Sequence, residues 1–246
     1  MEPLPTMTWR AALALWLVAT VVTIPFAWLL PGLPGMGPAG PAAPEVLGGL
    51  AFVYAIAALI GWAMGSRLGF GVPLTEAWLR GERPDARGLA RAAILGAVLA
   101  LGAVATVLMI AGPQAPPGVA AEASVMPAWG GLALALHGGV GEELIFRFGV
   151  MALFAWVIAQ LRRLVHSWEA LPNQSMIAWG GIVIAALLFG LAHGWDGSGA
   201  ILVQISFRIA AGILFGWLFW KRGLEAAMAA HLAYDLVVFY LILALV

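Results

Sequence analysis

Seven ionisable residues interrupt apolar stretches in the second half of this sequence. They are Glu142, Glu143, Arg147, His193, Arg208, His231 and Asp235. An ionisable group inside a membrane span is costly and usually faces a cavity or a partner. The first three apolar stretches contain no such residue. The second half is therefore predicted to hold a functional site, and the first half to act as scaffold.

The spacing of these residues indicates which side chains meet. Glu143 and Arg147 lie four residues apart, as do His231 and Asp235, so each pair shares one helix face. Glu142 is rotated by about 100° from Glu143, which leaves its carboxylate to face another group. A carboxylate and imidazoles that converge in an apolar cavity can activate water, because the carboxylate takes the proton and an imidazole orients the nucleophile. A remaining donor can stabilise the oxyanion.

Composition identifies the elements that must position these groups. The 246 residues are 63% hydrophobic and only 10% charged, with a mean hydropathy of +0.99, whereas soluble domains carry about 25% charged residues. One bilayer crossing needs roughly 20 apolar residues. Seven stretches are long enough: 11–30, 46–66, 92–111, 128–160, 177–194, 201–220 and 224–246. We expect one all-α, polytopic membrane domain over 1–246, with seven or eight transmembrane helices.

The fourth stretch, 128–160, is too long for one ordinary span and is interrupted by Gly138, Gly139 and Gly141. We expect its first part to be a packed, interfacial or re-entrant arm and its second part to be the crossing. The first stretch of the chain is expected to be a retained span, because no small-residue cleavage site follows it. Segments 31–44 and 112–118 are predicted loops, since both are rich in proline and glycine.

Two glycine pairs have the spacing that allows close helix contact in lipid. They are Gly61-x-x-x-Gly65 and Gly212-x-x-x-Gly216. We expect both pairs to serve packing.

Ten of the twelve basic residues fall on alternate loops. They are Arg10, Arg67, Arg80, Arg83, Arg87, Arg91, Arg162, Arg163, Lys221 and Arg222. The intervening loops contain none, so the positive-inside rule places the N-terminus and the basic loops in the cytoplasm. On this topology Glu142 and His193 lie toward the other side, and we expect the cavity to open in the outer half of a cell membrane. Upright spans would leave His193 and His231 about 14 Å apart in depth, a gap that tilt or a late helix start must close.

Three short motifs occur in order along the polar stretches. They are Glu142-Glu143-x-x-x-Arg147, Phe189-x-x-x-His193 and His231-x-x-x-Asp235. They resemble the EExxxR, FxxxH and HxxxN/D motifs of the CAAX protease and bacteriocin-processing family, which is similar to the type II CAAX prenyl endopeptidase, the Ras-converting enzyme. The resemblance covers roughly 127–241 and leaves 1–126 as a three-helix scaffold part. It implies an intramembrane endopeptidase whose substrate is a peptide or protein at the membrane.

The resemblance also implies a role for each matching residue. Glu142 would be the general base on water, and His193 would help to hold that water. His231 and the residue at 235 would bind the oxyanion.

Glu143 and Arg147 would shape the site through their ion pair. Prenyl endopeptidases have Asn where this chain has Asp235, and an ionised carboxylate would repel an oxyanion. Asp235 is therefore expected to pair with His231 or Arg208. Arg208 belongs to no motif, and it is interpreted either as a buried ion-pair partner or as the residue that binds an anionic substrate group.

Several alternatives stay open at this stage. A zinc protease could use Glu142, His193 and His231 as ligands, although no H-E-x-x-H motif occurs; otherwise no cofactor is expected. A proton-coupled transporter or a non-catalytic membrane partner would also tolerate buried charges. No G-x-S-x-G motif supports a serine protease, and zero net charge argues against nucleic acid. His137 and His166 fall in no motif and are expected to be structural.

Overall fold

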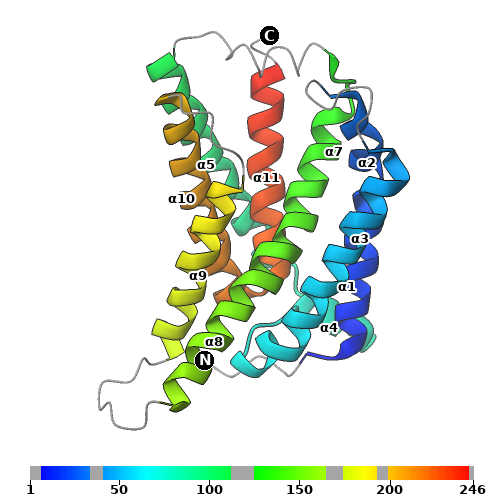
Figure 1. Cartoon of the computed structure of the whole chain (residues 1–246), viewed down its shortest axis with the longest axis vertical. Helices are drawn as coiled ribbons and strands as arrows, with labels where there is room; N and C mark the ends of the chain where they lie inside the picture. Colours follow the sequence, from blue (N-terminus) through cyan, green and yellow to red (C-terminus); the bar gives the residue numbers. More distant parts are fainter. Residues whose placement is uncertain (1–6, 34–40, 112–124, 165–173, 193–198, 244–246) are drawn as a thin grey trace.

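The structure is a computed structural model that describes residues 7–33, 41–111, 125–164, 174–192 and 199–243. Every regular element within these ranges is helical, which confirms the predicted all-α class. Figure 1 shows the long helices as one elongated bundle. The α-helices are α1 (Trp9–Val22), α2 (Ile24–Leu29), α3 (Ala43–Ile60), α4 (Pro73–Leu79), α5 (Arg87–Ala111), α7 (Gly130–Leu136), α8 (Ala152–Leu164), α9 (Gln174–Leu191), α10 (Gly199–Arg222) and α11 (Leu224–Leu243).

Several of these helices are extended by short turns of other helix types. The 3-10 turns are η1 (Leu30–Gly32) and η3 (Ser66–Leu68). The π-helical segments are η2 (Gly61–Gly65), η4 (His137–Glu142) and η5 (Leu144–Met151).

Six helical stretches in the described part of the chain are long and apolar enough to cross a membrane. They are Trp9–Gly32, Ala43–Leu68, Arg87–Met109, Gly130–Arg163, Gln174–Leu191 and Leu224–Leu241. Each overlaps an expected span, and α10 occupies the remaining one at 201–220. Large apolar side chains are exposed along these helices, for example Phe52 at 68% and Val98 at 61%. The chain is therefore a multi-pass membrane protein, as its composition predicted.

The fourth span differs from the expectation. Gly130–Arg163 is one continuous helical stretch of 34 residues, so its predicted division into an arm and a crossing is wrong. The glycines at 138, 139 and 141 do not end the helix, because the backbone changes there from α to π turns in η4. Figure 1 shows the stretch running obliquely through the bundle from α7 to α8. Tilt thus accommodates the extra length.

The last helix starts inside the bundle instead of at its end. Gly223, with φ of 95°, makes the tight turn from α10 into α11. The N–H of Leu224 donates to the carbonyl of Gly71 at 3.1 Å, and the Glu225 carboxylate accepts from the N–H of Thr75 at 2.8 Å. The chain around α4 thereby covers the start of α11, which lies above the lower end of α8 in Figure 1. This late start raises the residues of α11 within the bundle.

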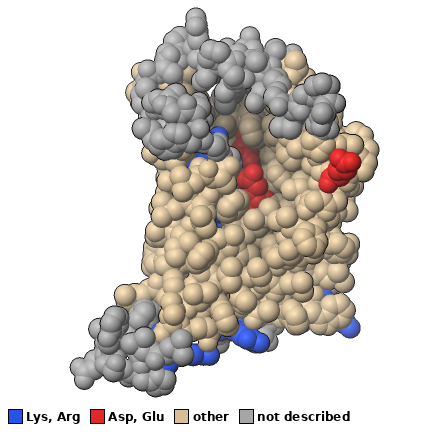
Figure 2. Space-filling view, viewed as in Figure 1, with Lys and Arg blue, Asp and Glu red and all other residues tan. Residues whose placement is uncertain are grey.

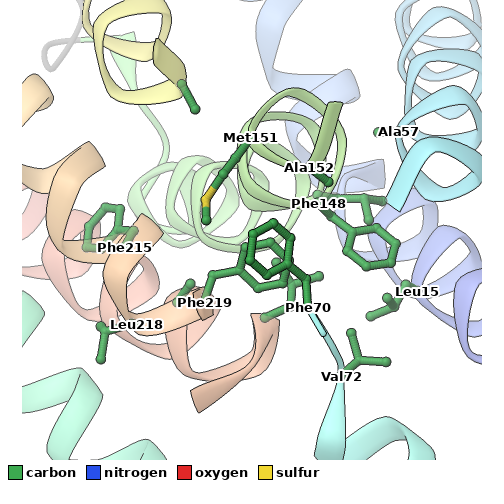
Figure 3. Packing of buried hydrophobic residues seen from close by; sticks show 14 of the residues in the cluster. Leu15, Ala57, Phe70, Val72, Phe148, Met151, Ala152, Phe215, Leu218 and Phe219 are labelled. Carbon is green, nitrogen blue, oxygen red and sulfur yellow. The ribbon is translucent and has the colours of Figure 1, made fainter. Parts of the chain in front are cut away.

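A buried apolar core joins the two halves of the sequence. Phe70 before α4, Phe148 in η5 and Phe219 in α10 meet in Figure 3, with ring centroids 5.2 Å apart for Phe70 and Phe219 and 6.2 Å for Phe148 and Phe219. All three are at most 2% exposed. This core fixes α10 against the fourth span.

Both predicted glycine pairs lie at close helix contacts. A Cβ at Gly65 would come within 3.2 Å of the Ala152 Cβ, and Gly61 faces the Phe148 ring. A Cβ at Gly212 would come within 2.9 Å of the Ala186 backbone. The small residues therefore serve packing between neighbouring helices, as expected.

Candidate active site

Glu143 stands at the centre of the polar cluster. It lies between η4 and η5, and its side chain is fully buried. One carboxylate oxygen, Oε1, lies 2.9 Å from Nδ1 of His231 on α11, and the other, Oε2, lies 3.3 Å from Nε of Arg147. The predicted pair of Glu143 and Arg147 is therefore present, and the same carboxylate also joins the fourth span to α11.

Arg147 is held in the core by aromatic rings. Its guanidinium is fully buried and lies 4.8 Å from the ring centroid of Phe189 and 5.6 Å from that of Phe215. Its nitrogens have no hydrogen-bond partner in the described part of the chain. A buried cation over aromatic faces is stabilised by the ring quadrupoles. Arg147 and Glu143 thus form a buried ion pair that is packed against the Phe189 and Phe215 rings.

His231 contacts a carboxylate through each ring nitrogen. Beyond the Nδ1 contact with Glu143, its Nε2 lies 3.4 Å from Oδ2 of Asp235, one turn along α11. The Phe215 ring stacks on the imidazole at 4.7 Å, and Phe189 packs edge-on at 5.6 Å. An ionised carboxylate only accepts hydrogen bonds. Each ring nitrogen that carries a proton can therefore donate to the carboxylate it faces.

Glycine allows α11 to come this close to the fourth span. A Cβ at Gly138 would collide with Oδ2 of Asp235, and one at Gly139 would come within 2.8 Å of the Leu232 Cα. A side chain at 139 would therefore push away the backbone of α11 next to His231, and one at 138 would displace the Asp235 carboxylate. The glycines that interrupt the apolar stretch are consequently a structural requirement of the site.

Glu142 lies beside this cluster and is partly exposed. Its side chain is 20% exposed and that of Asp235 is 13% exposed, whereas Glu143 is fully buried. Figure 2 shows acidic side chains at the bottom of a hollow in the upper half of one face, with basic atoms next to them. The other visible basic atoms lie at the lower end of the molecule. These acidic side chains thus lie in the half of the bundle opposite the basic end.

Arg208 lies on α10 among the same charges. Its guanidinium interacts electrostatically with Tyr234, Glu142 and Asp235. Its Nη1 is buried and has no hydrogen-bond partner among the described residues. Arg208 therefore presents a donor beside the carboxylates of the site.

The predicted Phe189-x-x-x-His193 motif is described only in part. His193 lies outside the described residues, although Phe189, the first residue of its motif, packs against His231. Within the described ranges no group of three His, Cys, Asp or Glu side chains could hold a metal ion. The described cluster thus contains Glu142, Glu143, Arg147, Arg208, His231 and Asp235.

His137 was expected to be purely structural, yet it lies next to Glu142. Nε2 of His137 lies 4.0 Å from Oε1 of Glu142, and Nδ1 lies 3.0 Å from the hydroxyl of Tyr54 on α3. Side chains five residues apart do not face each other on an α-helix. In η4 they come closer together, because π-helical hydrogen bonds join residues five apart.

Comparison with known proteins supports the family resemblance. The family model described as type II CAAX prenyl endopeptidase Rce1-like matches residues 124–237. The matched segment contains all three motifs and agrees with the resemblance predicted over 127–241. Neither a curated protein nor a solved structure matches the chain significantly.

Proposed function

Since the chain belongs to the CAAX protease and bacteriocin-processing family of membrane endopeptidases, we propose that it hydrolyses a peptide bond with a water molecule that Glu142 activates. The observation that carries this proposal is the contact of Glu143 with His231. It joins two motif-bearing helices in the core, while the side chain of the neighbouring Glu142 stays partly exposed.

In the first step, Glu142 accepts a proton from water while the water oxygen attacks the carbonyl carbon of the substrate. A partly exposed carboxylate suits this role because it can reach both water and substrate. In the second step the C–N bond breaks, and Glu142 returns the proton to the leaving amine. The products are a carboxylate and an amine. By family resemblance, His193 helps to hold the attacking water.

His231 stabilises the oxyanion of the tetrahedral intermediate. Its Nδ1 faces Glu143 and its Nε2 faces Asp235. A positively charged ring held in this way is already in position when the oxyanion forms, so it needs no rearrangement to stabilise it. Asp235 pairs with His231 and orients its ring. Both ring nitrogens face carboxylates in this arrangement. This supports a metal-free mechanism over a zinc site, because a nitrogen that binds a metal ion must be unprotonated.

Arg208 binds an anionic group of the substrate, such as a free C-terminal carboxylate. A guanidinium donates well to a carboxylate because its N–H groups match both oxygens. The buried Nη1, which lacks a hydrogen-bond partner among the described residues, supports this role. The substrate class is therefore a membrane-associated peptide or protein segment with its terminus near the cleaved bond.

The test uses purified chain in liposomes with a quenched fluorescent peptide that carries a farnesylated cysteine near a free C-terminus. The same peptide without the farnesyl group serves as the second substrate. We expect cleavage by the natural chain, a loss of roughly 100-fold or more in kcat for Glu142→Gln, and no effect of a metal chelator. Asp235→Asn retains its contact with His231 and keeps most of the activity.

Three results would contradict the proposal at different points. Full activity of Glu142→Gln would remove Glu142 from the mechanism. If a chelator abolished the activity and added zinc restored it, the mechanism would be zinc-dependent. Absence of cleavage of both peptides and of a random peptide library would exclude the endopeptidase.

A further inference from the structure

A chain of three side chains connects the N-terminal helices with the site. Thr23 lies at the break between α1 and α2, and its hydroxyl is 3.0 Å from that of Tyr54 on α3. The Tyr54 hydroxyl in turn lies 3.0 Å from Nδ1 of His137 in η4. Thr23 and Tyr54 are fully buried. Polar groups in such a position are normally part of a satisfied network, and this network ends at the site.

The ring of His137 is fixed in its plane as well as by its hydrogen bond. Phe26 of α2 stacks on it with centroids 3.9 Å apart and planes 2° from parallel. Gly141 leaves room for the contact, because a Cβ there would collide with the Tyr54 hydroxyl. His137 therefore has little freedom to turn, and its Nε2 is directed toward Oε1 of Glu142 at 4.0 Å.

The direction of the hydrogen bonds follows from the carboxylate. Glu142 attracts Nε2 only if that nitrogen carries a proton. In a neutral ring Nδ1 then accepts, so the Tyr54 hydroxyl donates to it, and Thr23 donates to Tyr54. Every hydroxyl in the chain thus donates toward Glu142. A separation of 4.0 Å is about 1 Å longer than a hydrogen bond, and such contacts often tighten when substrate binds.

We propose that His137 is a positioning residue that orients the carboxylate of Glu142, and that Tyr54 and Thr23 hold His137 for this task. The inference rests on the proposed role of Glu142. It gives the N-terminal helices a part in catalysis, since α2 and α3 supply the groups that fix His137. Each member acts through the next one, and of the four residues in this chain only Glu142 touches the reacting water.

The test compares two amide replacements of His137 that imitate different ring nitrogens. His137→Gln places an N–H near the position of Nε2, within reach of Glu142, whereas His137→Asn reaches only the position of Nδ1 and the Tyr54 hydroxyl. Tyr54→Phe removes the hydroxyl and keeps the ring. Tyr240→Phe is the matched control, because Tyr240 is 46% exposed on α11. The assay measures kcat and KM on the farnesylated quenched peptide, with thermal unfolding in detergent measured for every variant.

A misplaced catalytic group costs up to about 100-fold in rate. We expect His137→Asn and Tyr54→Phe to lower kcat by roughly 10- to 100-fold with little change in KM. His137→Gln should stay within about 3-fold of the natural chain, and Tyr240→Phe should not differ from it. A purely structural role would lower the unfolding temperature of His137→Gln and His137→Asn alike and would not separate their kcat values.

Equal kcat for His137→Asn and the natural chain would overturn the inference. So would equal losses for the Gln and Asn variants at unchanged unfolding temperature. If the His137 variants do not fold, Tyr54→Phe is the remaining test, and an unchanged kcat of Tyr54→Phe would overturn the inference. Glu142→Gln in the same assay separates failure of the proposed function from failure of this inference. Full activity of Glu142→Gln would refute the proposed function. An inactive Glu142→Gln beside a fully active His137→Asn would refute only the role of His137.

Discussion

At the scale of single residues, the two membrane-embedded arginines have different surroundings. Arg147 is fully buried, faces Glu143 at 3.3 Å and lies close to two aromatic rings. Arg208 instead lies among Tyr234, Glu142 and Asp235, and its Nη1 has no hydrogen-bond partner in the described part of the chain. Counted from the turn at Gly223, Arg208 lies about 22 Å along α10 and Asp235 about 18 Å along α11. By this count Arg208 lies slightly farther from the turn than Asp235.

Replacing Arg208 by Gln should distinguish substrates by their C-terminus. We expect kcat/KM for a peptide with a free carboxylate to fall roughly 10- to 100-fold, the value of a charge-assisted hydrogen bond. The C-terminally amidated peptide should be cleaved equally by both proteins, and Arg208→Lys should recover part of the loss. The measurement is a pair of kcat/KM values for each variant. Equal effects on both peptides would instead assign Arg208 to holding Asp235.

At the scale of helices, the contact between α5 and α11 positions His231. The two helices pack along each other, and Gly96 of α5 lies against the backbone carbonyl of Ala230, the residue before His231. At Gly102, on the same helix, a methyl group would meet no packing neighbour within 4 Å among the described residues. Together with Gly138 and Gly139 on the other side, Gly96 allows α11 to sit between two neighbours at backbone distance.

Alanine at these two glycines of α5 should therefore have opposite effects. Gly96→Ala inserts a methyl group into a filled contact and should destabilise the fold by about 1–3 kcal/mol, with a loss of activity because α11 shifts. Gly102→Ala should be neutral or stabilise by up to about 1 kcal/mol, because alanine is the better helix former. Thermal unfolding in detergent and kcat for both variants check this. Equal stability of the two variants would mean that α11 can move without cost.

The helix contacts also show how far the sequence could predict the site. A spacing of four residues predicted the pairs Glu143–Arg147 and His231–Asp235, and both are present. The same α-helical assumption concealed His137, because residues five apart lie about 140° apart around an α-helix. The π turns of η4 remove that separation. Residue spacing alone does not predict such a change of helix type. The three glycines at 138, 139 and 141 did indicate that the backbone could adopt it.

At the scale of the whole molecule, charge divides the bundle into two ends. Figure 2 shows basic atoms along the lower end and the acidic hollow in the upper half. Composition and the positions of basic residues were sufficient to predict this division. The depth of the site could not be predicted, because it depends on the late start of α11, where Leu224 donates to the carbonyl of Gly71 and Glu225 accepts from the N–H of Thr75. The positive-inside rule predicts that the basic end faces the cytoplasm, so we propose that the hollow opens toward the outer half of the membrane and that substrates reach it from that side.

The absence of cysteine from the sequence allows a direct test of this orientation. Ala42, directly before the span that starts at Ala43, and Ala86, directly before the span that starts at Arg87, are exposed, and the predicted topology places them on opposite sides of the membrane. We expect a membrane-impermeant maleimide to label Ala42→Cys in intact cells, and Ala86→Cys only after the membrane is permeabilised. Both single-cysteine proteins must retain peptidase activity for the result to count. Labelling of Ala86→Cys alone in intact cells would invert the topology, because the basic end would then lie outside. The hollow with Glu142 would in that case face the cytoplasm, and the substrate would be a protein tail presented from inside the cell.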